Sequence, residues 1–316
     1  MPLDTTVLGI VPEVTPGTYL APVLSTDALV TFGYNIVPIQ SEEVRRAIDL
    51  GFPGRRPSTK TGVHARHTFS VELAGAGTAT GVPFWAKILR GCLFGVAVPG
   101  ASSVSIPLAS NGDGGSLSIS GWKDQERFRA RMGRGNAVFT FTEKQLPRID
   151  FDLLGLIEGA GPSDASAPGA VTLPTYPNPV EVNLANTVIQ VDSYTLGMRE
   201  FSLDLGMRTE LYSTTGSRAI IFGKDESGDR RSPSFRLRAE LPGAAAKDYF
   251  APTLAGTPLS FSLVHGITAG NIIEMASSRL VFEDIQLSVE SNRIFMDATG
   301  GFIASAANND FTLVTK

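Results

Sequence analysis

The 316-residue sequence predicts a mainly β protein made of two similar halves, and three observations support this prediction. Apolar residues alternate with polar or small ones in many short runs, and glycine-rich clusters separate these runs. A segment rich in Gly, Pro and Ala lies near the middle of the chain. The length also favours about two domains.

Period-two alternation marks predicted strands along the whole chain. The clearest runs are Phe69/Val71/Leu73, Leu117/Ile119, Phe128/Ala130/Met132, Ile149/Phe151/Leu153, Phe201/Leu203/Leu205 and Leu259/Phe261/Leu263. Such alternation is typical of antiparallel strands that bury one face and solvate the other. Turn clusters at 111–115, 133–136 and 223–228 separate the runs.

Helix signals are sparse. Residues 83–90 predict one short helix, because Pro83 stands near its start and Gly91 can end it. Residues 41–50 predict a second helix, with Ser41 as N-cap and Gly51 as stop.

The segment 159–180 reads GAGPSDASAPGAVTLPTYPNPV, a composition that favours an extended linker. We therefore place one domain at 1–160, a linker at 161–180 and a second domain at 181–316.

The two halves share short sequence matches in the same order. Glu72-Leu-Ala-Gly-Ala76 precedes the aromatic pair of 84–91, and Glu240-Leu-Pro-Gly-Ala244 precedes that of 249–256. Further on, Gly135-Asn136 precedes 148–152, and Gly270-Asn271 precedes 279–283. This order predicts a tandem duplication in which each half carries about one short helix.

Composition excludes several classes of protein. Lys and Arg number 27 against 31 Asp and Glu, and neither half is basic, which argues against a strongly basic nucleic-acid binder. A single Cys cannot form a disulfide within one chain. One Cys and three His argue strongly against a Cys/His zinc cluster, because structural zinc needs four such ligands at tight spacing. No export signal is visible, and Pro and Gly interrupt both long uncharged runs, so we expect no membrane segment.

Candidate catalytic groups are few, and we expect no enzyme, cofactor or metal. His64 and His67 would face opposite sides of a strand. Cys92 lies in an apolar stretch that would keep its thiol inert. Asp150 and Asp152 share a strand face, for which a solvated or interface role is predicted over acid–base chemistry.

Two kinds of charged segment suit contacts between proteins. Arg127, Arg129 and Arg131 would form a basic stripe on one strand face, and we predict a salt-bridged subunit interface, with phosphate binding as the alternative. The long mixed-charge loops at 41–66 and 213–234 suit docking. The docking candidates are Glu42, Glu43, Arg45, Arg46, Arg55, Arg56, Lys60, Arg218, Lys224, Asp225, Arg230 and Arg231.

The order of several segments resembles the tail tube proteins of long-tailed, siphophage-type bacteriophages. The opening 11–22, the stretches 41–46, 69–77 and 83–91, the middle at 135–138 and 146–151, and the ending 308–313 carry the resemblance. It covers most of the chain, although Pro16 replaces the usual aromatic residue before Gly17 and the second half matches more loosely.

The resemblance implies two tandem β-sandwich or barrel-like tube domains. It also implies that sheets of neighbouring domains join into an inner barrel, and that stacked rings form the conduit for genome ejection. Three two-domain chains would complete a pseudo-sixfold ring, with a hexamer of chains as runner-up. The implied partners are further copies of the chain, the tape measure protein and phage genomic DNA in the lumen, and the tail terminator and distal tail proteins. The implied location is the virion tail, after synthesis in the host cytoplasm.

Two other classes of function stay open at this point. One is another β-rich tail, baseplate or carbohydrate-binding component, for which only Trp122 offers a free aromatic platform. The other is an all-β hydrolase, which would need a convergent set of catalytic groups that the sequence does not show.

Overall fold

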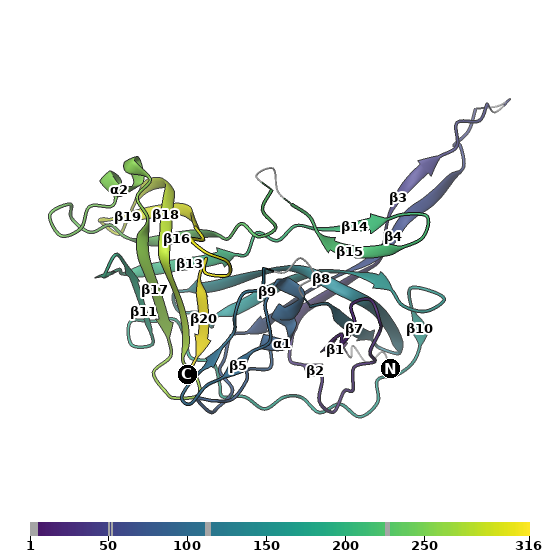
Figure 1. The fold of residues 1–316 in the computed structure, drawn as a ribbon, viewed down its shortest axis with the longest axis horizontal. Coiled ribbons are helices and arrows are strands. Elements are labelled where there is room, and N and C mark those ends of the chain that lie inside the picture. Colours follow the sequence, from purple (N-terminus) through teal and green to yellow (C-terminus); the bar gives the residue numbers. More distant parts are fainter. Residues whose placement is uncertain (1–5, 50, 52, 111–114, 225–227) are drawn as a thin grey trace.

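The computed structural model describes residues 6–49, 51, 53–110, 115–224 and 228–316. The protein is elongated, and its main element is an antiparallel sheet system of 18 strands that runs along the long axis (Figure 1). A separate two-stranded hairpin and two short α-helices complete the described part of the chain. The predicted mainly β fold, with about one short helix in each half, is confirmed.

In the described residues, the first half together with the linker strand β10 contains ten strands and one α-helix. They are β1 (Thr6–Pro12), β2 (Ala28–Leu29), β3 (Phe32–Arg45), β4 (Ser58–Glu72), α1 (Ala86–Leu89) with the 3-10 turn η1 (Arg90–Cys92), β5 (Val98–Pro99), β6 (Val104–Ser105), β7 (Leu117–Lys123), β8 (Glu126–Thr142), β9 (Arg148–Ile157) and β10 (Asp164–Ala165).

The described residues of the second half contain the other ten strands and the second α-helix. They are β11 (Thr187–Val191), β12 (Tyr194–Thr195), β13 (Met198–Asp204), β14 (Thr209–Ser213), β15 (Arg218–Phe222), β16 (Ser234–Glu240), α2 (Phe250–Ala255), β17 (Leu259–His265), β18 (Ile273–Glu290), β19 (Arg293–Phe302) and β20 (Thr312–Thr315).

The two halves pair their main strands in the same order. In the first half, hydrogen-bonded neighbours run β3–β4–β9–β8–β7–β1. In the second half they run β13–β16–β19–β18–β17–β11. A short helix follows the second strand of each series along the chain, α1 after β4 and α2 after β16.

The halves are joined by a strand pair. Residues Val138–Thr142 of β8 pair antiparallel with Glu200–Asp204 of β13, so eight strands form one continuous sheet in the order β3–β4–β9–β8–β13–β16–β19–β18. The side chain of Asn136 reinforces this junction by donating to Asp204 over 2.6 Å and accepting from the Met207 backbone N–H over 3.0 Å.

A second connection lies near the C-terminus. Strand β20 pairs with β6 of the first half as well as with β18. Nearby, Asn271 accepts a 2.8 Å hydrogen bond from the Gly75 N–H. Gly270 has a φ of +87°, and a Cβ atom at this position would lie 2.4 Å from the Gly77 carbonyl carbon. A side chain at Gly270 would meet that backbone, so the close approach of the two halves requires glycine here.

One hydrophobic core runs through both halves on one face of this sheet. It includes Phe69 and Phe151 of the first half, which stack at 5.2 Å, and Phe201 and Phe261 of the second, which stack at 5.1 Å. Trp85, just before α1, is fully buried and donates to the Ala74 carbonyl. No helix in the described ranges is long and apolar enough to cross a bilayer.

Two expectations from the sequence are wrong. Residues 41–45 belong to β3 rather than to a helix at 41–50, because 42–45 pair with 58–61 of β4, and this pairing overrides the local helix signal. The third sequence match aligns 148–152 of β9 with 279–283 of β18, but the counterpart of β9 in the pairing order is β19.

The predicted linker contains one short strand, β10, which pairs with β8. Tyr176 holds the following extended stretch against the first half by stacking on Phe84 at 4.7 Å and donating to Glu72 over 3.0 Å. Burial and the neighbouring carboxylate raise the pKa of Tyr176 to about 12.

Candidate functional site

The eight-stranded sheet has one polar face, opposite the hydrophobic core. The register places alternate residues of all eight strands on this face, for example Ser70, Asp150, Val138, Asp204 and Ser234, which lie opposite one another in successive strands. The residues between them, such as Val71 and Ile149, belong to the core. The face extends across both halves. The β14–β15 hairpin covers part of it, because Arg134, which the register places on the same face as Arg66, is buried and donates to the Ile220 carbonyl.

Carboxylates outnumber guanidinium groups on this polar face. The acidic positions, read from the register, are Glu72, Asp150, Asp152, Glu200, Asp204, Glu240, Asp284, Glu290 and Asp297. The basic positions are Arg66, Arg134, Arg148, Arg236, Arg238 and Arg293, of which Arg134 is buried. Nine acidic groups against six basic ones make the described part of the face net negative.

Ion pairs tie most of these arginines to the sheet. Arg66 pairs with Asp152 through two hydrogen bonds, Arg148 lies 3.1 Å from Asp150, and Arg238 lies 3.0 Å from Glu290. Each of these guanidinium groups is thus already neutralised by a carboxylate on the same face. The face offers an excess of negative charge and few arginines able to hold a phosphate.

Asp150 and Asp152 occupy the shared strand face that the sequence predicts. Asp150 accepts from Ser70 and Arg148, and Asp152 accepts from Arg66. Both carboxylates are thus paired with side chains of neighbouring residues on the same face.

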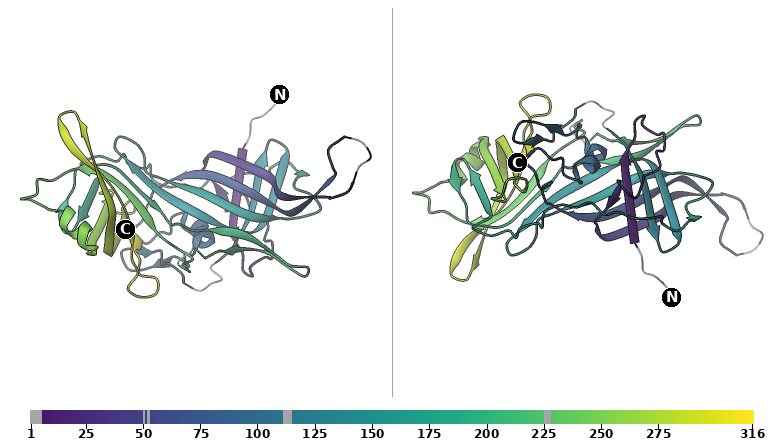
Figure 2. Two further views of the ribbon diagram at one scale, coloured as in Figure 1. Left: turned by 90° about the horizontal axis from the view of Figure 1, so that it is seen from above. Right: turned by 90° about the horizontal axis from the view of Figure 1, so that it is seen from below.

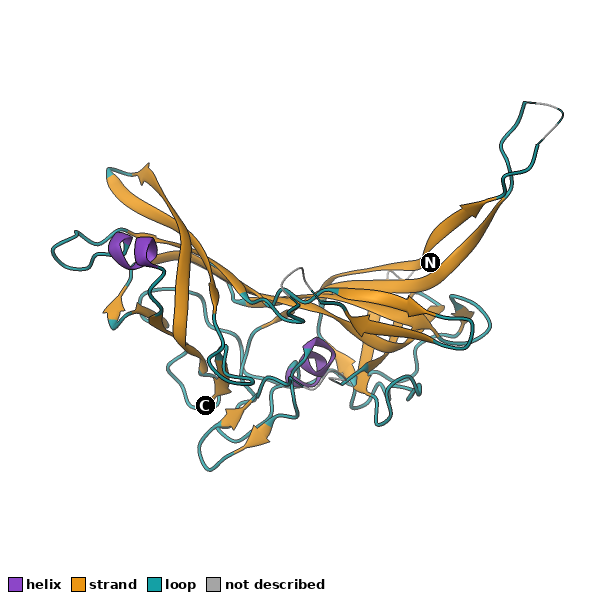
Figure 3. Ribbon diagram, turned by 45° about the horizontal axis from the view of Figure 1, so that its top comes forward, coloured by secondary structure: helices purple, strands orange, loops and turns teal. Residues whose placement is uncertain are grey.

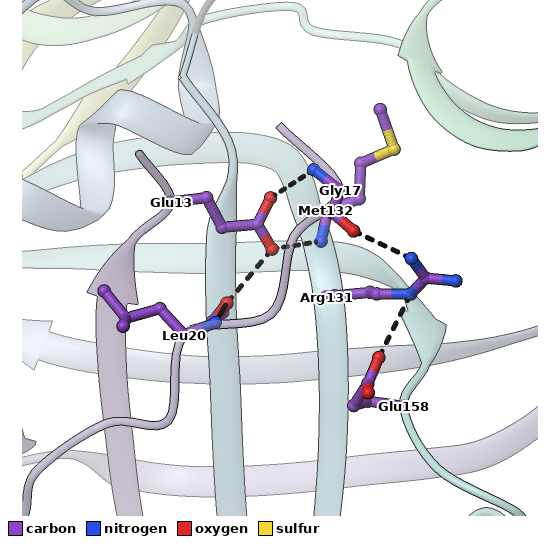
Figure 4. A network of polar contacts seen from close by, with 7 residues as sticks. Glu13, Gly17, Leu20, Arg131, Met132 and Glu158 are labelled. Carbon is purple, nitrogen blue, oxygen red and sulfur yellow. Dashed lines mark hydrogen bonds and ion pairs between the residues drawn. The ribbon is translucent and has the colours of Figure 1, made fainter. Parts of the chain in front are cut away.

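A buried carboxylate organises the N-terminal segment, and sequence reasoning did not single it out. Glu13 is 3% exposed and accepts hydrogen bonds from the backbone N–H groups of Gly17 and Met132 at 2.7 Å each (Figure 4). The hydroxyls of Ser116 and Ser118 donate to it as well, over 2.5 and 3.0 Å. The turn that follows is therefore fixed to β7 and β8. The signal in the sequence is an acidic residue four positions before a glycine, which by itself is too common to be diagnostic.

The arginine stripe of β8 is neutralised within the chain. Arg127 and Arg129 both pair with Asp164, at 2.8 and 2.7 Å, and Arg131 pairs with Glu158 at 3.1 Å while donating to the Gly17 carbonyl (Figure 4). The hydrogen bond from Arg127 holds the pKa of Asp164 below its usual range. These contacts attach the end of the first half to β8, and an interface role for the stripe stays a prediction.

The first docking segment forms a projecting arm. Strands β3 and β4 pair outward as far as Arg45 opposite Ser58, and the arm extends beyond the rest of the sheet (Figure 3). The arm brings together seven predicted docking residues: Glu42, Glu43 and Arg45 on β3, Arg46, Arg55 and Arg56 beyond the paired strands, and Lys60 on β4. Most of these side chains are exposed, and Glu43 lies 3.6 Å from Arg55.

The second docking segment is divided between two places. Arg218 starts β15, whose hairpin with β14 lies beside the base of the arm (Figure 1). Arg134 of β8 is buried and donates to the Ile220 carbonyl over 3.0 Å, which anchors this hairpin. Lys224 and Arg230 follow β15, whereas Asp225 lies outside the described residues.

Arg231 has a different environment from the other docking candidates. Its side chain is 9% exposed, pairs with Asp310 at 2.6 Å and donates to the Ala109 carbonyl. The guanidinium therefore links the second half to the first. Because the side chain is buried, little of its surface is accessible to another protein.

Most of the remaining candidate groups are buried, whereas His64 is half-buried and its Nδ1 lies 2.8 Å from the Gly62 carbonyl oxygen. Cys92 is fully buried, as its apolar stretch predicts, and burial raises the pKa of its thiol. Burial lowers the pKa values of His67 and His265 to about 4. Trp122, expected as a free aromatic, is only 4% exposed and packs against Leu24 and Ala28, so it provides no platform for a sugar ring.

A comparison with protein-family models agrees with the resemblance that the order of the sequence segments indicates. A family model described as phage tail tube protein matches residues 4–307. No curated protein matches the chain.

Proposed function

Because the chain belongs to the phage tail tube protein family, we propose that copies of it assemble into stacked rings whose central channel carries the genome into the host. Family membership makes it a structural component of the virion tail. The further steps concern the ring, the lumen and the contacts between rings, and each is supported by a separate feature of the fold.

The polar face of the eight-stranded sheet is the proposed lumen wall. Its excess of carboxylates is the observation that carries the proposal, because double-stranded DNA is densely negative and must slide without binding. A wall whose arginines are already paired repels phosphates and holds the duplex away from its surface. A basic wall would retain DNA by releasing its counterions.

Rings of three chains are the proposed stoichiometry. The repeated pairing order gives each chain two comparable four-strand units, so three chains supply six units to a pseudo-sixfold ring. The runner-up is a ring of six chains. Head-to-tail contacts of this kind close into rings when the rotation permits.

The β3–β4 arm is the proposed contact with the adjacent ring. It leaves the sheet at one end of the molecule, its side chains are mostly exposed, and it carries charges of both signs (Figure 2). We further propose a siphophage-type tail, synthesis in the host cytoplasm, contact with the tape measure protein in the lumen, and contact with tail terminator and distal tail proteins at the tube ends.

Electron microscopy of the purified protein tests the function. Hollow tubes or rings are expected, and a cross-section averaged to show three chains and six similar units supports the stoichiometry. Discrete monomers at concentrations where family tubes would form contradict the proposal, and six chains per ring would replace the trimer with the hexamer.

A further inference from the structure

We propose that rings close through one defined strand contact, in which β3 of one copy pairs antiparallel with residues 286–290 of β18 of the next copy. This inference rests on the proposed ring assembly and specifies its edges and register. It comes from comparing the strand contacts made inside the chain with the edges that the same chain leaves open.

The contact inside the chain supplies the template. Strand β13 pairs with β16 on one side and with β8 on the other, and so joins the two halves. When the pairing orders of the two halves are aligned, β3 of the first half corresponds to β13 of the second. In the same way, β8 of the first half corresponds to β18 of the second. In the described part of the chain, β3 pairs only with β4, and no strand pairs with the outer edge of β18 at 286–290.

The register follows from the sequence match Glu72/Glu240. Counting back six residues from each makes Arg66 and Ser234 equivalent, and their partners Val37 and Asp204 are then equivalent. Glu72 lies opposite Arg148 and Glu240 opposite Phe295, which makes Thr140 and Ser288 equivalent. Because Asp204 lies opposite Val138, the same geometry places Val37 opposite Gln286 of the next copy.

Exposure at the β18 edge agrees with this register. Leu287 and Val289 are 54% and 76% exposed, whereas their counterparts Phe139 and Phe141 are fully buried at the internal junction. Ile36 would lie opposite Leu287 as Leu203 lies opposite Phe139. An edge with unpaired backbone and exposed apolar side chains readily pairs with a strand of another chain, and β3 of a second copy is a strand of matching position.

The inference also explains how the lumen wall becomes continuous. Each chain contributes eight strands with one polar face, and the β18–β3 contact repeats the geometry that already joins β8 to β13. Three chains would then form a closed barrel without free strand edges on this sheet.

Disulfide trapping tests the register in the full-length protein. The variant Val37→Cys/Gln286→Cys should form crosslinks between chains, because residues directly opposite in antiparallel strands lie within disulfide range. The matched variant Val37→Cys/Glu290→Cys displaces one thiol by four residues, about 13 Å along the strand. It should crosslink about tenfold less. The variant Asp204→Cys/Val138→Cys reproduces the template and should crosslink within one chain.

The outcomes separate the inference from the proposed function. Crosslinks in the first variant, in a ladder that ends at the ring size, support the contact. Rings or tubes that form without this crosslink, or that crosslink equally in the displaced variant, overturn the contact and leave the proposed function standing. Absence of rings and tubes in the wild-type protein overturns both.

A second variant tests the same edge without cysteines. Leu287→Asp should leave the unassembled chain folded, because the side chain is exposed, and should abolish rings by placing a charge where an apolar side chain is to be buried. Ile267→Asp is the matched control, since Ile267 is 71% exposed and lies away from this edge. Normal rings from Leu287→Asp overturn the contact.

Discussion

Phe139 and Leu203 lie opposite each other across the β8–β13 contact, and both side chains are fully buried. The pair joins core residues of the two halves, so the halves share packing as well as backbone hydrogen bonds. Such a contact couples the unfolding of the segments on either side of it.

The first prediction concerns this junction. Leu203→Ala should lower the free energy of unfolding by about 2–5 kcal/mol, through lost burial and the cavity left behind. Denaturant unfolding of the unassembled protein measures the change. Leu287→Ala is the control, because Leu287 is the exposed counterpart of Phe139. This substitution should lower the free energy of unfolding of the unassembled protein by less than about 0.5 kcal/mol. Equal effects of the two variants would contradict the structural difference between the junction and the open edge.

Much of the fold is predictable from the sequence because its strands carry local signals. Alternation identifies the cores of β4, β9 and β17, and Pro83 with Gly91 locates the first helix. The segment 41–45 shows the limit, because its charges and Ser41 favour a helix locally, whereas pairing with 58–61 makes it a strand. A partner strand that is distant along the chain leaves no local signal.

The candidate site is predictable only in part for the same reason. The sequence indicates that Asp150 and Asp152 share a face, but the acidic wall appears only when eight strands are in register. The buried position of Glu13 depends on Met132, more than a hundred residues away. The intrachain partners of the arginine stripe, Asp164 and Glu158, are likewise set by the path of the chain after β9.

The second prediction concerns the buried carboxylate. Glu13→Ala removes the acceptor of two backbone N–H groups and two hydroxyls, and should lower the free energy of unfolding by at least about 3 kcal/mol. Glu13→Gln keeps one acceptor oxygen and should lower the free energy of unfolding by less than Glu13→Ala does. Thermal and denaturant unfolding of both variants measure the difference, and equal losses would show that the negative charge matters more than the number of acceptors.

The third prediction concerns pH. The folded pKa values of about 4 at His67 and His265 lie below the ordinary value of 6.5. As pH falls, the histidines of the unfolded chain therefore take up protons before those of the folded chain. The stability that the neutral histidines contribute is complete above pH 6.5 and is lost as pH falls toward 4. The loss in the free energy of unfolding is about 1.4 kcal/mol per pH unit for each histidine. Unfolding free energies between pH 7 and 4 measure it.

Variants separate the two histidines. His67→Gln preserves a polar partner for the Tyr34 hydroxyl, which lies 3.1 Å from Nδ1, and should flatten the pH dependence in part. Adding His265→Gln should flatten it further. An unchanged slope in the double variant would assign the acid sensitivity to carboxylates instead.

The fourth prediction concerns the lumen wall. Asp150→Lys/Asp152→Lys reverses two charges in each chain and frees Arg66 and Arg148 from their partners. Assembled variant tubes should bind short duplex DNA with an affinity that falls steeply with salt, whereas wild-type tubes should not bind it. Glu181→Lys is the control, because it changes an exposed charge outside the eight strands. DNA binding by the control but not by the double variant would contradict the proposed lining.

The fifth prediction concerns the β3–β4 arm. Arg45 and Ser58 lie opposite each other, so replacing residues 46–57 with Asn-Gly closes the two strands through a two-residue hairpin turn. The shortened protein should keep the wild-type free energy of unfolding, because exposed residues at the arm end contribute little to the core. Single rings should form, since the β18 edge and residues 32–37 of β3 are intact, but rings should not stack.

Electron microscopy together with the mass of the assembled species distinguishes rings from tubes. Replacing Thr214–Ser217, the tip of the β14–β15 hairpin, with Asn-Gly is the matched control and should stack normally if the arm alone makes the contact. Normal tubes from the arm variant would remove the arm from the inter-ring contact and leave the ring itself unaffected.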